Sequence, residues 1–160
     1  MTYRQYFHSP IGIIMVSATE SSLQQIMFME EEKDTAEPND ITRFVVDQLQ
    51  AYFAHEAHKD IFPLLRKGSA FQRRVWERIR SIPPGSTMTY QELALALGDI
   101  KQTRAVARAL ATNPCLVLLP CHRVMGKDGR LRGYAGSPSR KQWLLQFEAG
   151  EVEQLSLFSA

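Results

Sequence analysis

Cysteine and histidine are scarce in this sequence, and their spacing excludes several classes of site. The 160 residues contain two cysteines, Cys115 and Cys121, and four histidines. They form no C-x-x-C pair and lack the spacing of a structural zinc site. Neither a G-x-G-x-x-G fingerprint nor a P-loop is present, which excludes the common motifs for bound nucleotides. We therefore expect no metal and no cofactor.

Long apolar runs are also absent. No run approaches the roughly 20 residues that a membrane-spanning helix needs, and residues 1–6 lack the apolar core of a signal peptide. We therefore expect a cytoplasmic protein with no membrane partner, in a reducing compartment where both cysteines stay thiols. A content of 44% hydrophobic and 22% charged residues is typical of a globular protein of one domain or two small ones.

The net charge of +2 conceals a strong asymmetry along the chain. Residues 1–65 hold four Lys/Arg and ten Asp/Glu, whereas residues 66–147 hold fifteen Lys/Arg and only four Asp/Glu. A basic block on an otherwise acidic chain is typical of a protein that binds a polyanion. A solvated basic surface would give the same count, so charge alone leaves both readings open.

The first third of the sequence is typical of a small β-rich unit. Strands are expected at residues 11–16, after the turn signal His8-Ser9-Pro10, and at residues 23–28. Asp40 is expected to cap a helix with one apolar face, made by Ile41, Phe44, Val45, Leu49 and Tyr52. Residues 55–68 are expected to form a linker.

The second half is mostly helical in pattern. Apolar side chains recur every four residues over 71–79, which predicts a helix. Thr89 and Glu92 have the spacing of a capping box, so another helix is expected to begin there and to end at Gly98. A helix over residues 103–112 follows closely, and the pair predicts a helix-turn-helix.

Two more elements complete the expected fold. A strand over residues 116–119 should lead into Pro120-Cys121-His122, and Pro138 should open a final helix after a loop over 126–137. The fold class is therefore α+β. A small N-terminal domain with an antiparallel β-sheet would occupy residues 1–68, and a helical, winged-helix-like C-terminal domain would occupy residues 69–160.

The segment Pro120-Cys121-His122-Arg123-Val124 brings a nucleophile, a base and a cation together. A thiol reacts as its thiolate, and an ordinary pKa of roughly 8.5 leaves most of it protonated at neutral pH. An imidazole can take that proton, and Arg123 would favour the anion. Adjacent side chains diverge on a regular helix or strand, so contact needs an irregular backbone, which Pro120 favours. Alone, the pattern favours a buried structural cysteine over a reactive one.

In its wider context this segment resembles the active-site signature of the O6-alkylguanine-DNA alkyltransferases, also called methylated-DNA–protein-cysteine methyltransferases. Further motifs of that family occur in the same order and spacing: Phe71-Gln72, Val75-Trp76, Ile82-Pro83 with Gly85, Tyr90, Leu93-Ala94, Arg104-Ala105-Val106, Asn113-Pro114, Gly133-Tyr134-Ala135-Gly136, Lys141, Trp143-Leu144-Leu145 and Glu148. The resemblance implies stoichiometric, single-turnover transfer of an alkyl group to the cysteine. Its source is O6-alkylguanine, or less readily O4-alkylthymine, in double-stranded DNA.

The resemblance also implies a role for each catalytic residue. Cys121 accepts the alkyl group, His122 acts as its base through a bridging water, and Glu148 orients His122. Tyr90 donates a hydrogen bond to a ring nitrogen of the flipped guanine, so that the base departs neutral. Asn113 supports the active-site turn.

The helix over 103–112 has two faces that suit DNA. Val106, Ala109 and Leu110 share one face and should pack inward, whereas two arginines lie on another with small residues. The resemblance implies that this helix enters the minor groove of DNA and that Arg104 fills the space left by the extruded base. The protein is expected to bind as a monomer. The residues expected to contact DNA are Arg104, Ala105, Arg108, Arg123, Tyr134, Ala135 and Gly136, the last three from a loop over the base.

Some positions depart from the family pattern, and two other functions stay open. Ala107 and Ser137 stand where glycines are frequent, and Leu116 stands where some relatives have proline. A non-enzymatic, alkyltransferase-like DNA-damage binding module would lack the cysteine. A thiol hydrolase using Cys121 and His122 would turn over esters or amides.

Overall fold

A computed structural model describes residues 1–33, 35–127 and 134–151. These residues divide into two units. The first is residues 1–67 with the distant segment 114–118, and the second is residues 68–113 and 119–151, each as far as described. The first unit holds a three-stranded antiparallel sheet and the second is mainly helical, so the expected α+β fold is confirmed.

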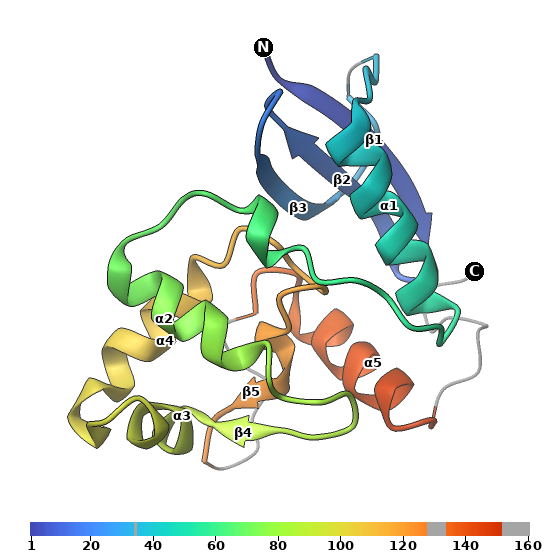
Figure 1. The fold of residues 1–160 in the computed structure, drawn as a ribbon. Coiled ribbons are helices and arrows are strands. Elements are labelled where there is room, and N and C mark those ends of the chain that lie inside the picture. The colour runs from blue at the N-terminus through green and yellow to red at the C-terminus, as the bar shows by residue number, and fades with distance from the viewer. Residues whose placement is uncertain (34, 128–133, 152–160) are drawn as a thin grey trace. The chain divides into compact units, whose positions relative to one another are not determined.

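The sheet of the first unit has the order β1-β2-β3 (Figure 1). The two expected strands are confirmed as β2 (Gly12–Ala18) and β3 (Leu23–Met29). Strand β1 (Tyr3–Ser9) was missed because it is rich in polar residues and half-buried along most of its length. A tight hairpin joins β1 to β2, with Ser9 opposite Gly12.

The outer edge of β3 is covered by two segments from elsewhere in the first unit. Leu65 pairs with Leu23, and Cys115 pairs with Ile26. The expected linker over 55–68 is therefore wrong in part, because residues 61, 62 and 65 are buried around a short 3-10 helix, Phe62–Leu64. Covering the edge removes the unpaired backbone groups that would otherwise invite aggregation.

The expected strand over residues 116–119 is wrong. Only Cys115 pairs with the sheet, and residues 116–118 form a turn in which Val117 has φ 71°. A hydrogen bond from Leu118 N to Leu116 O, 2.8 Å long, closes this three-residue γ-turn. Apolar runs do not distinguish a strand from a buried turn, which explains the error.

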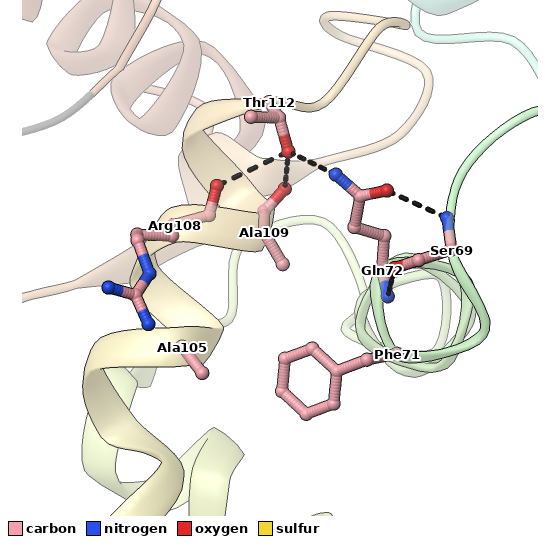
Figure 2. A pocket seen from close by; sticks show the side chains of 7 residues that line it. All are labelled: Ser69, Phe71, Gln72, Ala105, Arg108, Ala109 and Thr112. Atoms are coloured by element: carbon pink, nitrogen blue, oxygen red, sulfur yellow. Dashed lines mark hydrogen bonds between the residues drawn. The ribbon is translucent and has the colours of Figure 1, made fainter.

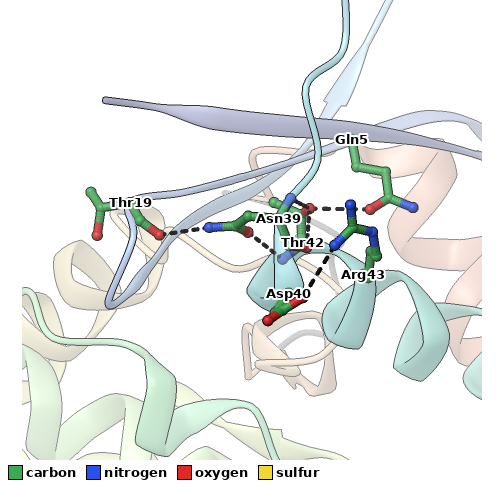
Figure 3. A network of polar contacts seen from close by, with 6 residues as sticks. All are labelled: Gln5, Thr19, Asn39, Asp40, Thr42 and Arg43. Atoms are coloured by element: carbon green, nitrogen blue, oxygen red, sulfur yellow. Dashed lines mark hydrogen bonds and ion pairs between the residues drawn. The ribbon is translucent and has the colours of Figure 1, made fainter.

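Helix α1 (Asp40–Phe53) packs on β1 and β2, and its N-cap is Asn39. Asn39 Oδ1 accepts from Thr42 N at 2.9 Å, and Thr42 Oγ1 accepts from Asn39 N at 2.9 Å (Figure 3). Asn39 Nδ2 also donates to Thr19 O at 3.0 Å, which ties the helix to the sheet. The expectation that Asp40 caps this helix is wrong, since Asp40 lies in the first turn and pairs with exposed Arg43.

The second unit contains α2 (Ala70–Ile79), β4 (Met88–Thr89), α3 (Tyr90–Ala96), α4 (Thr103–Ala111), β5 (Val124–Met125) and α5 (Pro138–Glu148). The capping box of Thr89 and Glu92 and the position of Pro138 at the start of α5 are confirmed. Helices α3 and α4 pack together and form the helix-turn-helix. The two short strands β4 and β5 are parallel.

Trp76 anchors the packing of α2 against α4. Its side chain is buried, and its Nε1 donates to Ala109 O at 2.8 Å. Gly68 precedes α2 with φ 103°, and a Cβ there would lie 2.5 Å from the Trp76 ring. A larger residue at position 68 would therefore be both strained and in steric conflict with the indole.

Alanine substitutions at neighbouring positions test which residue caps α1. We expect Asn39→Ala to lower the free energy of unfolding by about 1–2 kcal/mol, because the cap and the bond to Thr19 are both lost. Asp40→Ala should change it by less than about 0.5 kcal/mol, since Asp40 is exposed. Urea unfolding of both variants measures this, and a larger loss for Asp40→Ala would reverse the assignment.

Candidate active site

The backbone around Pro120 presents Cys121 away from regular structure. Pro120 has φ −83° and ψ 61°, and Cys121 N donates to Leu119 O at 2.8 Å, which is an inverse γ-turn. A 3-10 turn then spans Cys121–Arg123. The expected irregular backbone at Pro120 is confirmed, and its fixed φ suits this turn.

Glu148, at the end of α5, holds both residues that follow Cys121. Its Oε2 lies 2.7 Å from His122 Nε2. Arg123 donates to the same carboxylate twice, from Nε to Oε1 at 2.8 Å and from Nη2 to Oε2 at 2.9 Å. The side chains of His122, Arg123 and Glu148 are 0%, 7% and 2% exposed. A buried, bidentate pair of this kind is rigid and directional.

This arrangement determines which nitrogen of His122 carries the hydrogen. Burial raises the pKa of Glu148, but the interactions of its carboxylate with His122 and Arg123 outweigh burial and hold that pKa well below its usual range. The carboxylate is therefore ionised and accepts only, so Nε2 of His122 must donate to it. Burial also lowers the pKa of His122, which keeps the imidazole neutral. The lone pair is thus on Nδ1, which has no hydrogen-bond partner in the described part of the chain.

Cys121 rests as a thiol. It is 6% exposed, and burial raises its pKa to about 11. Three interactions oppose that rise: a hydrogen bond from Asn113, the positive charge of Lys141 and a hydrogen bond from the backbone of Cys121 itself. The expectation that Arg123 favours the thiolate is not supported, because its charge is already paired with Glu148. A base must therefore remove the proton when the thiol reacts.

Asn113 joins the end of the α4 segment to the turn that bears the cysteine. Its side chain is buried, and Nδ2 donates to Leu119 O at 2.9 Å. The same side chain hydrogen-bonds Cys121 and lowers the pKa of the thiol. Asn113 therefore both fixes the turn and favours the anion.

Tyr90 is half-buried at the first position of α3. Strand β4, which leads into α3, pairs with β5, which follows the cysteine turn: Met88 lies opposite Val124. Burial and the negative charge of an ionised Cys121 raise the pKa of Tyr90. The phenol therefore keeps its proton and remains a hydrogen-bond donor.

Lys141 is the residue of this site to which sequence analysis assigned no role. It is 1% exposed, and its Nζ donates to Val124 O at 2.6 Å. Burial lowers its pKa, whereas the charge of Cys121 raises it. A signal was present in the sequence: Lys141 lies at positions i−3 and i−7 from Leu144 and Glu148, on the inward face of α5.

The two faces expected for α4 are confirmed. Val106, Ala109 and Leu110 are buried, whereas Arg104 and Arg108 are exposed. Neither guanidinium has a hydrogen bond or ion pair within residues 1–33, 35–127 and 134–151. Ala105, half-buried, lines a surface groove between α4 and the start of α2 (Figure 2).

The other residues expected to contact DNA are placed differently. Arg123 is buried beside Glu148, and its Nη1 donates to Ile82 O at 2.6 Å, so it is not available at a surface. Tyr134 and Gly136 are buried and Ala135 is exposed, with the Tyr134 ring 6.2 Å from that of His122. Gly133 and the loop part over 128–132 lie outside the described residues.

Two positions that depart from the family pattern have distinct environments. Ser137 has φ 90°, which explains why glycine suits this position, and its Oγ caps α5 by accepting from Arg140 N. Leu116 is buried, and its backbone N donates to Ile26 O at 3.0 Å. A proline at position 116 would lose that bond.

No group of three or more His, Cys, Asp and Glu side chains in the described residues could hold a metal ion. No helix in the same residues is long and apolar enough to cross a membrane.

Comparison with known proteins gives matches over both halves of the chain. Residues 70–150 match the family model of the 6-O-methylguanine DNA methyltransferase DNA binding domain, and residues 2–64 match that of its ribonuclease-like domain. A methylated-DNA–protein-cysteine methyltransferase of Methanosarcina acetivorans is 38% identical over 91% of this chain and 97% of its own. Its Mycobacterium tuberculosis counterpart is 36% identical over 99% of each chain.

Solved structures agree with these matches. The crystal structure of the Mycobacterium tuberculosis O6-methylguanine methyltransferase is similar with a TM-score of 0.80 and 35% identity, covering 96% of each chain. That of Mycobacterium tuberculosis OGT in complex with DNA has a TM-score of 0.82 and 36% identity, covering 98% of this chain and 99% of the other.

Replacing Glu148 by Gln tests the buried carboxylate. The change leaves Arg123 without its counter-ion, so we expect the free energy of unfolding at pH 7 to fall by about 3–5 kcal/mol. Because the pKa of Glu148 is lowered by folding, its stabilisation is present above the ordinary Glu value near 4.3 and is lost as the pH falls below it. Folding also lowers the pKa of His122, so the wild-type protein loses further stability as the pH falls below about 6.5.

Urea unfolding at pH 7, 5 and 3.5 measures this difference. The gap between the wild-type protein and Glu148→Gln should narrow toward pH 3.5, and the exposed control Glu151→Gln should match the wild type. An equally stable Glu148→Gln at pH 7 would contradict the pairing.

Proposed function

Because the chain belongs to the 6-O-methylguanine DNA methyltransferase family, we propose that it repairs DNA by transferring the alkyl group of O6-alkylguanine, or of O4-alkylthymine, to Cys121. It acts as a monomer on double-stranded DNA, without a metal or cofactor. The observation that carries this proposal is the buried series Cys121, His122, Glu148, in which only Nδ1 of a neutral imidazole is free to accept a proton. The reaction needs free thiols, which suits the reducing cytoplasm.

The chemistry balances with the residues of the site. The Cys121 proton passes to His122 Nδ1, by way of a water molecule, and the thiolate attacks the alkyl carbon. The carbon–O6 bond breaks while the carbon–sulfur bond forms, and the phenol of Tyr90 supplies a proton to the ring nitrogen of the departing guanine, so that the base leaves neutral. The proton that His122 took from Cys121 then returns to the Tyr90 oxygen through solvent, which leaves a neutral imidazole, a neutral phenol and the thioether. Glu148 stabilises the imidazolium that forms. Lys141 and Asn113 favour the thiolate in the buried site.

A resting thiol with a pKa of about 11 suits a protein that is used once. The thiolate is the reactive form, so a protonated Cys121 resists alkylating agents in solution. Proton removal is then coupled to a bound substrate. A thioether is a stable product, and the proposed mechanism has no step that would remove the alkyl group.

Base flipping is assigned to α4. Arg104 is exposed on the first turn of the helix with an unpaired guanidinium, as far as the described residues go. Filling the stack with this side chain offsets part of the few kcal/mol that extrusion costs. Tyr134, Ala135 and Gly136 close over the extruded base, and the exposed Ala135 offers a backbone N–H to the guanine oxygen.

The two alternative functions leave some residues of the site unexplained. An alkyltransferase-like binding module would have no use for a cysteine with a base beside it. A thiol hydrolase would need neither the exposed arginines of α4 nor a phenol near the sulfur. Both predict that the protein keeps its original mass after exposure to alkylated DNA.

Stoichiometric alkylation is the direct test. Incubation with duplex containing O6-methylguanine should add the mass of one methylene to the peptide holding Cys121, after which activity stops. Cys115→Ala is the matched control and should react normally, because Cys115 is fully buried in the first unit with a pKa raised to about 12. Cys121→Ala should bind DNA and transfer nothing. Multiple turnovers, or methylation of Cys115, would rule out the proposal.

Arg104→Ala separates flipping from chemistry. Loss of the inserted side chain should slow repair of duplex by about 10- to 100-fold, corresponding to a few kcal/mol of flipping cost. Dealkylation of free O6-alkylguanine base needs no flipping and should keep its rate. Second-order rate constants with both substrates measure this, and equal losses on the two would show that Arg104 acts elsewhere.

A further inference from the structure

A preformed groove of about 400 Å³ lies beside α4, outside the residues that carry the chemistry. One wall comes from the start of α2, with Ser69, Phe71 and Gln72. The other is a stripe of α4 formed by Ala105, Arg108, Ala109 and Thr112. In Figure 2 the Phe71 ring extends from α2 toward Ala105. The groove therefore has an apolar floor and a single cation at its rim.

Hydrogen bonds hold one end of this groove closed. Gln72 Nε2 donates to Thr112 Oγ1 at 3.0 Å, and Gln72 Oε1 accepts from Ser69 N at 2.7 Å (Figure 2). Thr112 Oγ1 lies 3.0 Å from Ala109 O and 3.2 Å from Arg108 O, to which its hydroxyl donates. The walls are fixed before a ligand arrives, which lowers the ordering cost of binding.

The charge of the groove selects an anionic occupant. None of its lining residues is acidic. Arg108 is exposed, and its guanidinium makes no hydrogen bond or ion pair with any residue that the structure describes. The surrounding sequence, residues 66–147, carries fifteen Lys/Arg against four Asp/Glu. An anionic ligand with an apolar face would contact both the Arg108 guanidinium and the apolar lining of the groove.

The position of the groove identifies that occupant. This step rests on the proposed function, in which α4 enters the minor groove with Arg104 in the base stack. A helix about 10–12 Å across in the minor groove is flanked on each side by one phosphodiester strand. Arg108 lies one turn beyond Arg104, about 6 Å along the axis. The strand on the α2 side must pass over Phe71 and Arg108.

We propose that the groove between α2 and α4 binds one DNA strand next to the lesion, with a deoxyribose packed on Phe71 and Ala105 and the adjoining phosphate on Arg108. The contact reads no base and is the same for any sequence. It orients α4 so that Arg104 meets the stack. Phe71 thus contributes binding that does not depend on salt, and Arg108 contributes binding that does.

Equilibrium binding to undamaged duplex over a range of salt concentrations separates the two contacts. Arg108→Gln should reduce the slope of log K against log salt by about 0.9, the value for one phosphate. Phe71→Ala should weaken binding about fivefold at every salt concentration with no change in slope, and Phe71→Leu by less. Arg43→Gln, which removes an exposed charge from α1 in the first unit, should match the wild type.

Other results of these measurements would contradict the proposed contacts. An unchanged slope for Arg108→Gln places no phosphate there, and unchanged affinity for Phe71→Ala places no sugar. Loss of self-association in either variant, with DNA binding intact, would make the groove an interface between two copies. A circular-dichroism spectrum and an unfolding midpoint like those of the wild type show that each variant is folded. A wild-type protein that takes no alkyl group from alkylated DNA would overturn the proposed function, while the binding comparison would still decide whether the groove binds a DNA strand.

Discussion

The carboxylate of Glu148 is the constraint on which the site depends. It is buried at the end of α5 and accepts hydrogen bonds from both His122 and Arg123, the residues that directly follow Cys121. Burying an ion costs several kcal/mol unless it is paired, so the cysteine turn loses several kcal/mol of stability when one partner of the buried pair is removed. One interaction therefore fixes the path of the backbone, the orientation of the imidazole and the nitrogen that bears its hydrogen.

The same burial explains why the nucleophile is inactive at rest. Desolvation raises the pKa of Cys121 to about 11, and Asn113 and Lys141 only partly offset it. Arg123 contributes little to the thiolate, because its charge is taken by Glu148. The site thus separates two tasks. One cation stabilises the orienting carboxylate, and another, Lys141, lies near enough to Cys121 to affect its titration. In the proposed mechanism, the thiol therefore reacts only when a bound substrate couples proton removal by His122 to proton donation by Tyr90.

The sequence predicted what depends on local pattern and missed what depends on distant packing. The helices of the second unit, the Thr89 capping box and the two faces of α4 follow from spacing alone, and all were found in the structure. The pairing of Cys115 with Ile26 and the turn at Val117 are set by contacts distant in sequence, so a strand was expected there instead. Asp40 was expected as the cap of α1, but the cap is the neighbouring Asn39, whose side chain also reaches Thr19, a contact distant in sequence. The buried position of Arg123 had no signal in the sequence, since charged residues are expected at the surface, and that of Lys141 was indicated only by its spacing from Leu144 and Glu148.

The protonation state of His122 is the property on which the proposed mechanism depends most. Nitrogen-15 NMR of the unreacted protein at neutral pH, with the ring assigned by comparison with His122→Gln, reports which nitrogen carries the hydrogen. We expect a neutral imidazole with the hydrogen on Nε2, facing Glu148, and an unprotonated Nδ1. A hydrogen on Nδ1, or a doubly protonated ring, would contradict the mechanism, because the thiol of Cys121 would then have no base to receive its proton.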